Sequence, residues 1–146
     1  LKVNIVKAIP MPPISLKKGP VAIFPKNKKV KNFFNKIGTT IEIKDEKLSK
    51  NFWTISGTMA SFYELLNVLT NWLIKEKVDK KDAQKYVTHL YSALAQLAAS
   101  NTSKPLKYLV EEQTPGGLNW QGVNELRKLG YYRLLEKSLK KIYKRL

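Results

Sequence analysis

The stretch WTISGTMASFYELLNVLTNWLIKEKV, residues 53–78, decides the fold of this chain. Drawn as an α-helix, it carries apolar side chains around nearly its whole circumference. A helix that is apolar on every side is buried on every side. A chain of 146 residues can hardly supply enough neighbours for such a helix. We therefore expect a second copy of the chain to wrap around it, in a homodimer or a higher oligomer.

Helical patterns continue from this stretch to the C-terminus. Asp79 and Ser103 are each placed to cap the start of a helix, because short polar side chains accept hydrogen bonds from its first amides. Gly57 either caps the apolar helix or allows another backbone to approach it closely. The predicted helices cover residues 80–100, 104–112, 118–129 and 131–146.

Residues 1–44 show a different pattern. The predicted strands cover residues 3–8, 21–24 and 39–43, and a small helix covers residues 28–37. So few elements leave sheet edges unpaired and one face uncovered, so we interpret them as the last piece of an α/β sheet. Because the first residue is Leu1, we expect a longer natural chain. The expected fold is α+β by content and mostly α, divided between residues 44 and 45.

The composition excludes several kinds of site. The chain has no cysteine, which excludes disulfides, thiolate metal ligands and cysteine nucleophiles. It has one histidine, His89, whose neighbours at helical spacing do not orient an imidazole; a packing or surface role is favoured, and we expect no metal. No GxGxxG, GK[ST] or HExxH motif occurs in the sequence. Apolar runs are too short for a membrane span, so we expect a cytoplasmic protein without a membrane partner.

The net charge of +16 comes almost entirely from lysine. Arginine, the residue that forks onto phosphates and guanine edges, is rare, and the lysines are scattered along the chain. A solvated, lysine-rich surface is therefore favoured, and a nucleic-acid partner is not expected. The alternative is a non-catalytic helical dimerisation module that binds a polyanion through its basic C-terminal helix.

The sequence TPGG, residues 114–117, holds the only adjacent glycines of the chain. A helix is predicted to begin directly after them, and its first amides lack acceptors and lie at the positive end of the helix dipole. Gly116 and Gly117 have no side chains to keep a carboxylate or phosphate away, and Thr114 and Asn119 could add donors on either side. The loop is therefore a candidate anion cradle. The same residues form a good helix-to-helix turn, and the motif alone favours that simpler interpretation.

Three motifs resemble, in this order, those of the pyrroline-5-carboxylate reductases, the last enzymes of proline synthesis. KAIPMPP, residues 7–13, resembles the family's strand followed by RxMPNTP. SGTMASF, residues 56–62, resembles SGSGPAY, which opens the family's first long dimerisation helix. TPGGLN, residues 114–119, resembles SPGGTT, which precedes a leucine-rich helix. The resemblance covers essentially the whole chain.

The resemblance implies a fold and a reaction. Residues 1–44 would be the C-terminal end of an NAD(P)-binding Rossmann domain, and residues 45–146 an all-helical, intertwined dimerisation domain. The implied oxidoreductase transfers a hydride from NADPH or NADH to the C=N bond of a cyclic imino acid that carries a carboxylate. Most of the cofactor site would lie upstream of Leu1, so the fragment alone is expected to be inactive.

The resemblance also implies roles for residues of the TPGG loop. Thr114, Gly116, Gly117 and Leu118 would bind the substrate carboxylate. Asn119 would be the catalytic residue, because it stands in place of a family threonine whose hydroxyl lies near the imine nitrogen. An asparagine amide can donate a hydrogen bond there but cannot shuttle a proton.

Pro10 and Met11 would contact the nicotinamide of the cofactor. The sequence departs from the family pattern at this point, where Met11 and Pro12 replace Asn-Thr. It departs again where Met59 and Ala60 replace Gly-Pro, at the wall where substrate and dimer meet. These departures bear on which imine the site would accept.

Overall fold

The computed structural model describes residues 3–100 and 103–146. The chain divides into two compact units. The first comprises Leu1–Thr58 with Ser138–Leu146, and the second comprises Met59–Lys137. The prediction of a mostly helical fold with a small sheet is confirmed. The domain boundary predicted between residues 44 and 45 stays a prediction.

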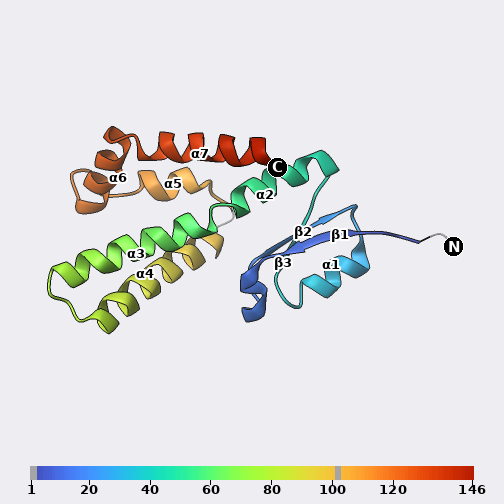
Figure 1. The fold of residues 1–146 in the computed structure, drawn as a ribbon, viewed down its shortest axis with the longest axis horizontal. Coiled ribbons are helices and arrows are strands. Elements are labelled where there is room, and N and C mark those ends of the chain that lie inside the picture. The colour runs from blue at the N-terminus through green and yellow to red at the C-terminus, as the bar shows by residue number, and fades with distance from the viewer. Residues whose placement is uncertain (1–2, 101–102) are drawn as a thin grey trace. The chain divides into compact units, whose positions relative to one another are not determined.

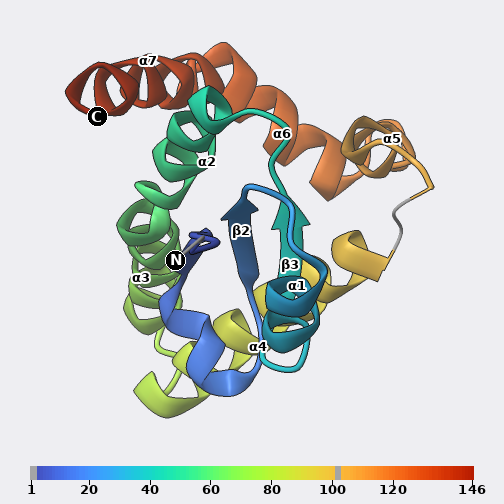
Figure 2. The same cartoon turned by 90° about the vertical axis from the view of Figure 1, so that its right-hand side faces the viewer.

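The first unit contains a three-stranded sheet in the order β1-β2-β3 (Figure 1). The strands are β1 (Lys7–Pro10), β2 (Pro20–Phe24) and β3 (Thr39–Glu42). β1 pairs with β2 in antiparallel fashion, whereas β2 and β3 are parallel and point the same way in Figure 2. The short helix η1 (Pro12–Leu16) follows β1, and α1 (Lys28–Phe34) connects β2 to β3. A parallel pair needs such a crossover, so this part has the α/β character that its sequence predicts.

The two faces of the sheet carry different rows of apolar side chains, and only one of these rows is buried. Val21 and Ile23 are completely buried, and they point to the same face because strand side chains alternate. The register aligns Ile9, Ala22 and Ile41 in a row across the other face. Both faces are therefore apolar, as expected of a strand that lies inside an α/β sheet.

Helix α1 is fixed to β3 by polar contacts. The Lys31 ammonium lies 2.8 Å from the Glu42 carboxylate, and the Thr40 N–H donates to Asn35 Oδ1 over 3.0 Å. The hydrogen bond from Lys31 and its positive charge lower the pKa of Glu42 below its ordinary value. At the start of α1, Asn27 Oδ1 accepts from the Val30 N–H over 3.1 Å, which satisfies one of the free amides of the helix.

The remainder of the first unit is helical. It contains η2 (Glu46–Leu48), α2 (Ser49–Ser56) and the last residues of α7 (Tyr131–Arg145). α2 ends at Gly57, and a Cβ atom on Gly57 would lie 3.1 Å from Ile142 Cγ2. The Lys50 ammonium lies 4.3 Å from the centre of the Tyr143 ring, a cation–π distance. Gly57 therefore ends α2 rather than capping the start of the apolar helix α3, and the group that approaches it from α7 is a side chain rather than a backbone.

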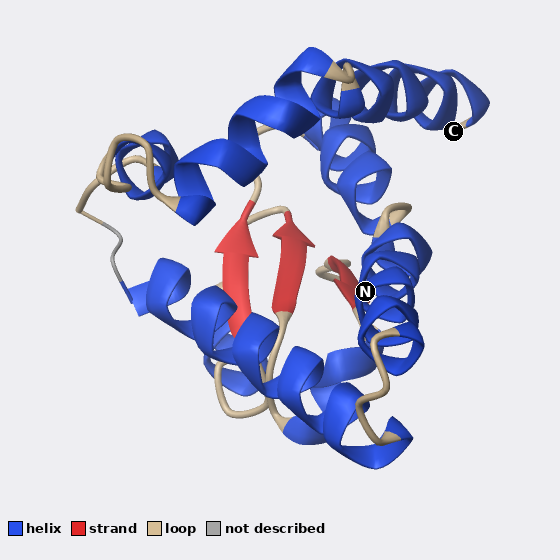
Figure 3. Ribbon diagram, turned by 90° about the vertical axis from the view of Figure 1, so that its left-hand side faces the viewer, coloured by secondary structure: helices blue, strands red, loops and turns tan. Residues whose placement is uncertain are grey.

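The second unit is all-helical (Figure 3). It contains α3 (Met59–Lys75), α4 (Lys80–Ser100), α5 (Leu106–Glu111), α6 (Leu118–Lys128) and the first residues of α7. α3 and α4 pack side by side as a hairpin. Asp79 caps α4 as predicted, because its Oδ1 accepts from the Lys81 N–H over 2.8 Å. None of the helices among the described residues is long and apolar enough to cross a lipid bilayer.

Several predicted boundaries are wrong. The stretch 53–78 is two helices, because α2 ends at Gly57 and α3 begins at Met59. The first strand is Lys7–Pro10 rather than residues 3–8, since its bounds follow its pairing with β2. The small helix α1 ends at Phe34, three residues before the predicted end at residue 37. α5 begins after Pro105 rather than at residue 104, because a residue before proline avoids the helical conformation.

Candidate functional site

The TPGG loop is a β-turn that joins α5 to α6. The Gly117 N–H donates to the Thr114 carbonyl oxygen over 2.9 Å. Pro115 is the second residue of this turn and Gly116 is the third, with φ +76°. Proline followed by a residue of positive φ is the signature of a type II turn. The interpretation of TPGG as a helix-to-helix turn is therefore confirmed.

The turn changes the predicted anion cradle. The prediction that the amides of residues 116–118 are all unshielded is wrong for Gly117, because its N–H already has an acceptor. The N–H groups of Gly116 and Leu118 have no acceptor within the described ranges. Leu118 is the first residue of α6, where free amides and the helix dipole favour negative charge. The amides left for an anion are therefore that of Gly116 and those of the first turn of α6, and not that of Gly117.

An open hollow of about 310 Å³ lies at this helix start. Its lining residues are Gln113, Thr114, Gly117, Leu118 and Asn119. The structure thus brings together four of the five loop residues singled out from the sequence. Gly116 does not line the hollow. Its role in the fold is to adopt the positive φ of the turn. The roles of these residues toward a substrate stay predictions.

Gln113 is a residue of the site that its sequence context does not reveal. Its Nε2 group donates to the Leu109 carbonyl oxygen over 2.9 Å. Its Oε1 atom accepts from Asn119 Nδ2 over 3.0 Å, so the pair spans the turn. Gln113 is half-buried and Asn119 is exposed. The only signal in the sequence is that an amide side chain stands on each side of TPGG.

Pro10 and Met11, the predicted cofactor contacts, belong to the first unit, whereas the TPGG loop belongs to the second. Pro10 is the last residue of β1, and Met11 precedes η1. Met11 lines an apolar hollow of about 300 Å³, and Pro10 does not. The other lining residues are Ile9, Pro20, Ala22, Ile41, Phe52, Trp53, Ile55 and Ser56. This hollow has the surface that a flat apolar ring requires and no cation for a phosphate.

His89 lies on α4 with its ring exposed. Its Nδ1 atom is 2.8 Å from the Lys85 carbonyl oxygen of the preceding turn. The imidazole is thus tied to the backbone of its own helix, which supports the predicted surface role. Among residues 3–100 and 103–146, no three histidines, aspartates or glutamates are grouped as metal ligands would be.

Helix α3 presents large apolar side chains to the outside of the single chain. Phe62 is 46% exposed, Tyr63 61% and Trp72 60%. No described residue of α3 is buried. An apolar surface of this kind marks an interaction site in a soluble domain. The expectation that this stretch needs neighbours beyond one chain is consistent with these exposures.

The fold and the loop define a class of protein, namely a mostly helical chain that begins with a small three-stranded sheet. A family profile described as pyrroline-5-carboxylate reductase dimerisation matches residues 46–146. This match covers more than half of the sequence, and the chain belongs to the pyrroline-5-carboxylate reductase dimerisation family. A comparison with curated protein sequences gives no significant match.

Solved structures of similar fold include two pyrroline-5-carboxylate reductases and one pyrroline carboxylate reductase. The pyrroline-5-carboxylate reductase of Coxiella burnetii has a TM-score of 0.80 and 20% identity, and the Streptococcus pyogenes enzyme has 0.78 and 20%. The Plasmodium falciparum pyrroline carboxylate reductase, solved with NADP bound, has a TM-score of 0.77 and 19% identity. Each comparison covers 96% of this chain. The chain spans only 55% of the Coxiella structure, 59% of the Plasmodium structure and 57% of the Streptococcus structure.

Proposed function

We propose that the chain is the C-terminal portion of an NAD(P)H-dependent oxidoreductase that reduces a cyclic imino acid, as in the last step of proline synthesis. In this proposal residues 1–44 close the NAD(P)-binding Rossmann domain and residues 45–146 form the dimerisation domain. The observation that carries the proposal is the hollow at the start of α6, inside the segment that matches the reductase family.

The start of α6 supports the binding of a carboxylate. The Leu118 N–H is free at the positive end of the helix dipole, and the Thr114 hydroxyl lines the same hollow. Gly117 adds no side chain to the lining, so a ligand can approach the backbone. A hydrogen bond to a charged group contributes roughly 1.5–3 kcal/mol, which is enough to orient a small acid. The substrate class that this site favours is therefore a small ring with a carboxylate.

Fewer residues of this chain support the proposed cofactor than support the proposed substrate. A reduced nicotinamide cofactor supplies the hydride when bound. Met11 and the apolar row of the sheet fit the ring end of such a cofactor, because their hollow has an apolar lining. The phosphates and the ribose need charged and polar partners that this hollow does not offer. The bound NADP of the Plasmodium structure supports a nicotinamide dinucleotide as the cofactor.

The exposed apolar side chains on different sides of α3 support a homodimer. A second copy of the chain would cover Phe62, Tyr63 and Trp72, which are at least 46% exposed in one copy. The family profile is that of a dimerisation domain, which supports a second copy of the chain as the partner that covers these side chains. The apolar area then buried would stabilise association by roughly 25 cal/mol per Å² before the entropy of association is subtracted.

The proposal is tested by measuring imine reduction with the full-length protein. Oxidation of NADPH or NADH in the presence of a cyclic imino acid is followed by absorbance. Asn119→Ala and Gly117→Val should each raise KM or lower kcat, because both residues line the hollow. Gly122→Ala serves as a matched control, since a Cβ atom on Gly122 would meet nothing within 4 Å. Unchanged kinetics in the first two variants would remove the site assignment.

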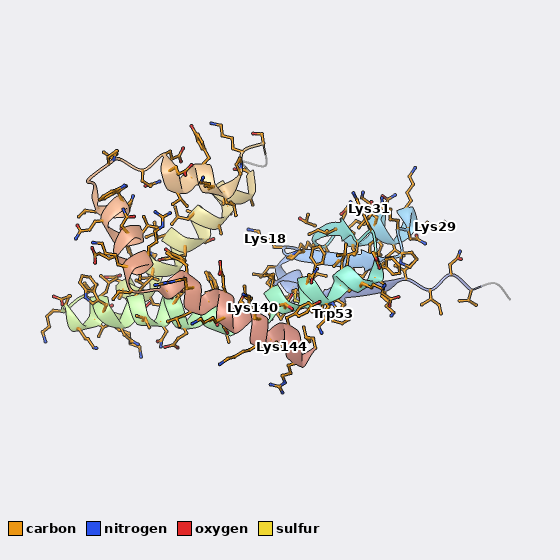
Figure 4. All side chains as sticks on the ribbon, turned by 90° about the horizontal axis from the view of Figure 1, so that it is seen from above. Lys18, Lys29, Lys31, Trp53, Lys140 and Lys144 are labelled. Carbon is orange, nitrogen blue, oxygen red and sulfur yellow. The ribbon has the colours of Figure 1, made fainter. Side chains whose placement is uncertain are left out.

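A second candidate function is favoured by the charge of α7. Five of its basic residues recur at spacings of three or four and so share one helix face. They are Lys137, Lys140, Lys141, Lys144 and Arg145. None of them forms an ion pair within the part of the chain that the structure describes, and Figure 4 shows Lys140 and Lys144 on the helix. If this face binds a polyanion, log K should fall against log salt with a slope of about −4. A flat salt dependence would exclude this function.

A further inference from the structure

Two hydrogen bonds link the Leu109 carbonyl, Gln113 and Asn119, and we call this chain of contacts the relay. The relay determines how the Asn119 side-chain amide is oriented. The Leu109 carbonyl can only accept a hydrogen bond, so Gln113 must present its Nε2 group to that oxygen, 2.9 Å away. The Oε1 atom of Gln113 is then left for Asn119, which must present its own Nδ2 group across 3.0 Å. Within residues 3–100 and 103–146, no donor reaches Asn119 Oδ1. The exposed amide therefore presents its Oδ1 acceptor together with the second N–H of Nδ2.

We propose that Gln113 is a positioning residue that makes Asn119 present its Oδ1 atom, a hydrogen-bond acceptor, to the protonated imine nitrogen of the substrate. This inference rests on the proposed imine reduction and refines it. A family threonine hydroxyl can donate or accept at one atom, whereas an asparagine held by the relay keeps Oδ1, which only accepts, separate from its one remaining Nδ2 proton. The hollow that Asn119 lines is also the hollow that would hold the carboxylate, so one small ring could reach both groups.

The chemistry of the reaction favours an acceptor at this position. The imine nitrogen takes a proton from solvent, which makes the ring carbon of the C=N bond electrophilic. A reduced nicotinamide cofactor, when bound, would supply a hydride to this carbon, and the π electrons of the C=N bond would move onto nitrogen. The product is a neutral secondary amine that keeps the proton on nitrogen. An oxygen that accepts a hydrogen bond from the protonated imine favours the charged form, and so raises the pKa of the bound substrate.

The relay explains why Gln113 would matter without touching the substrate. If Gln113 is removed, the Asn119 amide can rotate and present Nδ2 instead of Oδ1. An N–H group facing the imine nitrogen favours its unprotonated form, which accepts hydride poorly. The loss would therefore be largest at alkaline pH, where less of the bound imine is protonated. A purely structural role of Gln113 would lower the activity equally at every pH.

The test uses the full-length protein with Gln113→Met. This substitution keeps the length of the side chain and removes the hydrogen bonds of Gln113 to the Leu109 carbonyl and to Asn119. The dependence of kcat on pH reports ionisations in the bound complex. We expect its alkaline limb to move to lower pH by about one unit in Gln113→Met, which corresponds to a tenfold change in the protonation equilibrium. Asn119→Ala should show the same shift, and the double variant should shift no further than Asn119→Ala alone. Gln121→Met is the matched control and should leave the limb unchanged.

An alkaline limb that stays in place in Gln113→Met, or additive shifts in the double variant, would overturn the inference. A second readout does not need turnover. In the nuclear magnetic resonance spectrum, one of the two Asn119 Nδ2 protons should lie downfield and return to its ordinary position in Gln113→Met. Identical Asn119 signals in both proteins would overturn the relay itself. A wild-type protein with the downfield proton but no imine reduction would instead overturn the proposed function, and the substrate role of Oδ1 with it.

Discussion

The three glycines of the loop and of α6 should respond differently to alanine, because each has a different environment. Gly116 has φ +76° and open space around its missing Cβ atom. An L-residue in this conformation costs roughly 1–2 kcal/mol. The lower entropy of the unfolded chain offsets about 0.4–1 kcal/mol of that cost. The free energy of unfolding should therefore fall by about 1 kcal/mol in Gly116→Ala, with KM nearly unchanged because Gly116 does not line the hollow.

Gly117→Ala should change KM more than it changes the free energy of unfolding. Its φ of −73° suits any residue, but a Cβ atom would lie 3.0 Å from the Thr114 carbonyl oxygen and 3.5 Å from Thr114 Cβ. The turn must give way by a few tenths of an ångström at the wall of the hollow. If one hydrogen bond to the substrate carboxylate is lost, about 1.5 kcal/mol or more is lost with it, and KM should rise about tenfold or more. Gly122 lies inside α6, and Gly122→Ala should stabilise the protein by about 0.5–1 kcal/mol.

The assay combines urea unfolding and steady-state kinetics of the full-length protein, with protein concentration held fixed because the protein is proposed to be a dimer. The three variants must leave the urea m-value unchanged, so that the changes in midpoint report stability. The reasoning fails if Gly116→Ala raises KM more than Gly117→Ala. It fails also if Gly116→Ala is as stable as the wild type.

Three further outcomes follow from the structure. Gly57→Ala should destabilise the protein by about 1–3 kcal/mol, because its Cβ atom would lie 3.1 Å from Ile142 Cγ2, and Ile142→Ala, which removes that atom, should cost less in the Gly57→Ala background than in the wild type in thermal unfolding. The lowered pKa of Glu42 beside Lys31 contributes stability that is present above pH 4.5 and is lost as the pH falls through the lowered pKa. The Tm of Glu42→Gln should therefore lie below that of the wild type at neutral pH and approach it in acid; a constant gap would contradict this. Trp72→Glu should dissociate the dimer in sedimentation experiments, and a wild-type mass for this variant would argue against α3 as the interface.

The sequence predicts the local elements of this fold better than their contacts. The α1 and α4 starts follow from Asn27 and Asp79, whose caps depend only on the next three residues. The type II turn follows from Pro115 and Gly116, because a proline followed by a glycine favours this turn without help from distant residues. The bounds of β1 could not be predicted, since they are set by pairing with a strand that lies a dozen residues away.

The residues of the site show the same division. TPGG is visible in the sequence, but the bond that occupies the Gly117 N–H becomes evident only when the turn is closed. The Gln113–Asn119 pair spans six residues and depends on the angle between α5 and α6, so no periodic pattern announces it. The contact of Gly57 with Ile142 joins residues at distant points of the chain and has no local signal.

The central claim is that the first turn of α6, with Thr114 beside it, holds the carboxylate of a cyclic imine. The most direct measurement compares kcat/KM of the full-length protein for a cyclic imino acid and for the same ring without its carboxylate. Because a hydrogen bond to a charged group contributes roughly 1.5–3 kcal/mol, the account predicts a preference of about 10- to 100-fold for the acid, reduced in Gly117→Val. Equal values for the two rings, or a preference that Gly117→Val leaves intact, would contradict it.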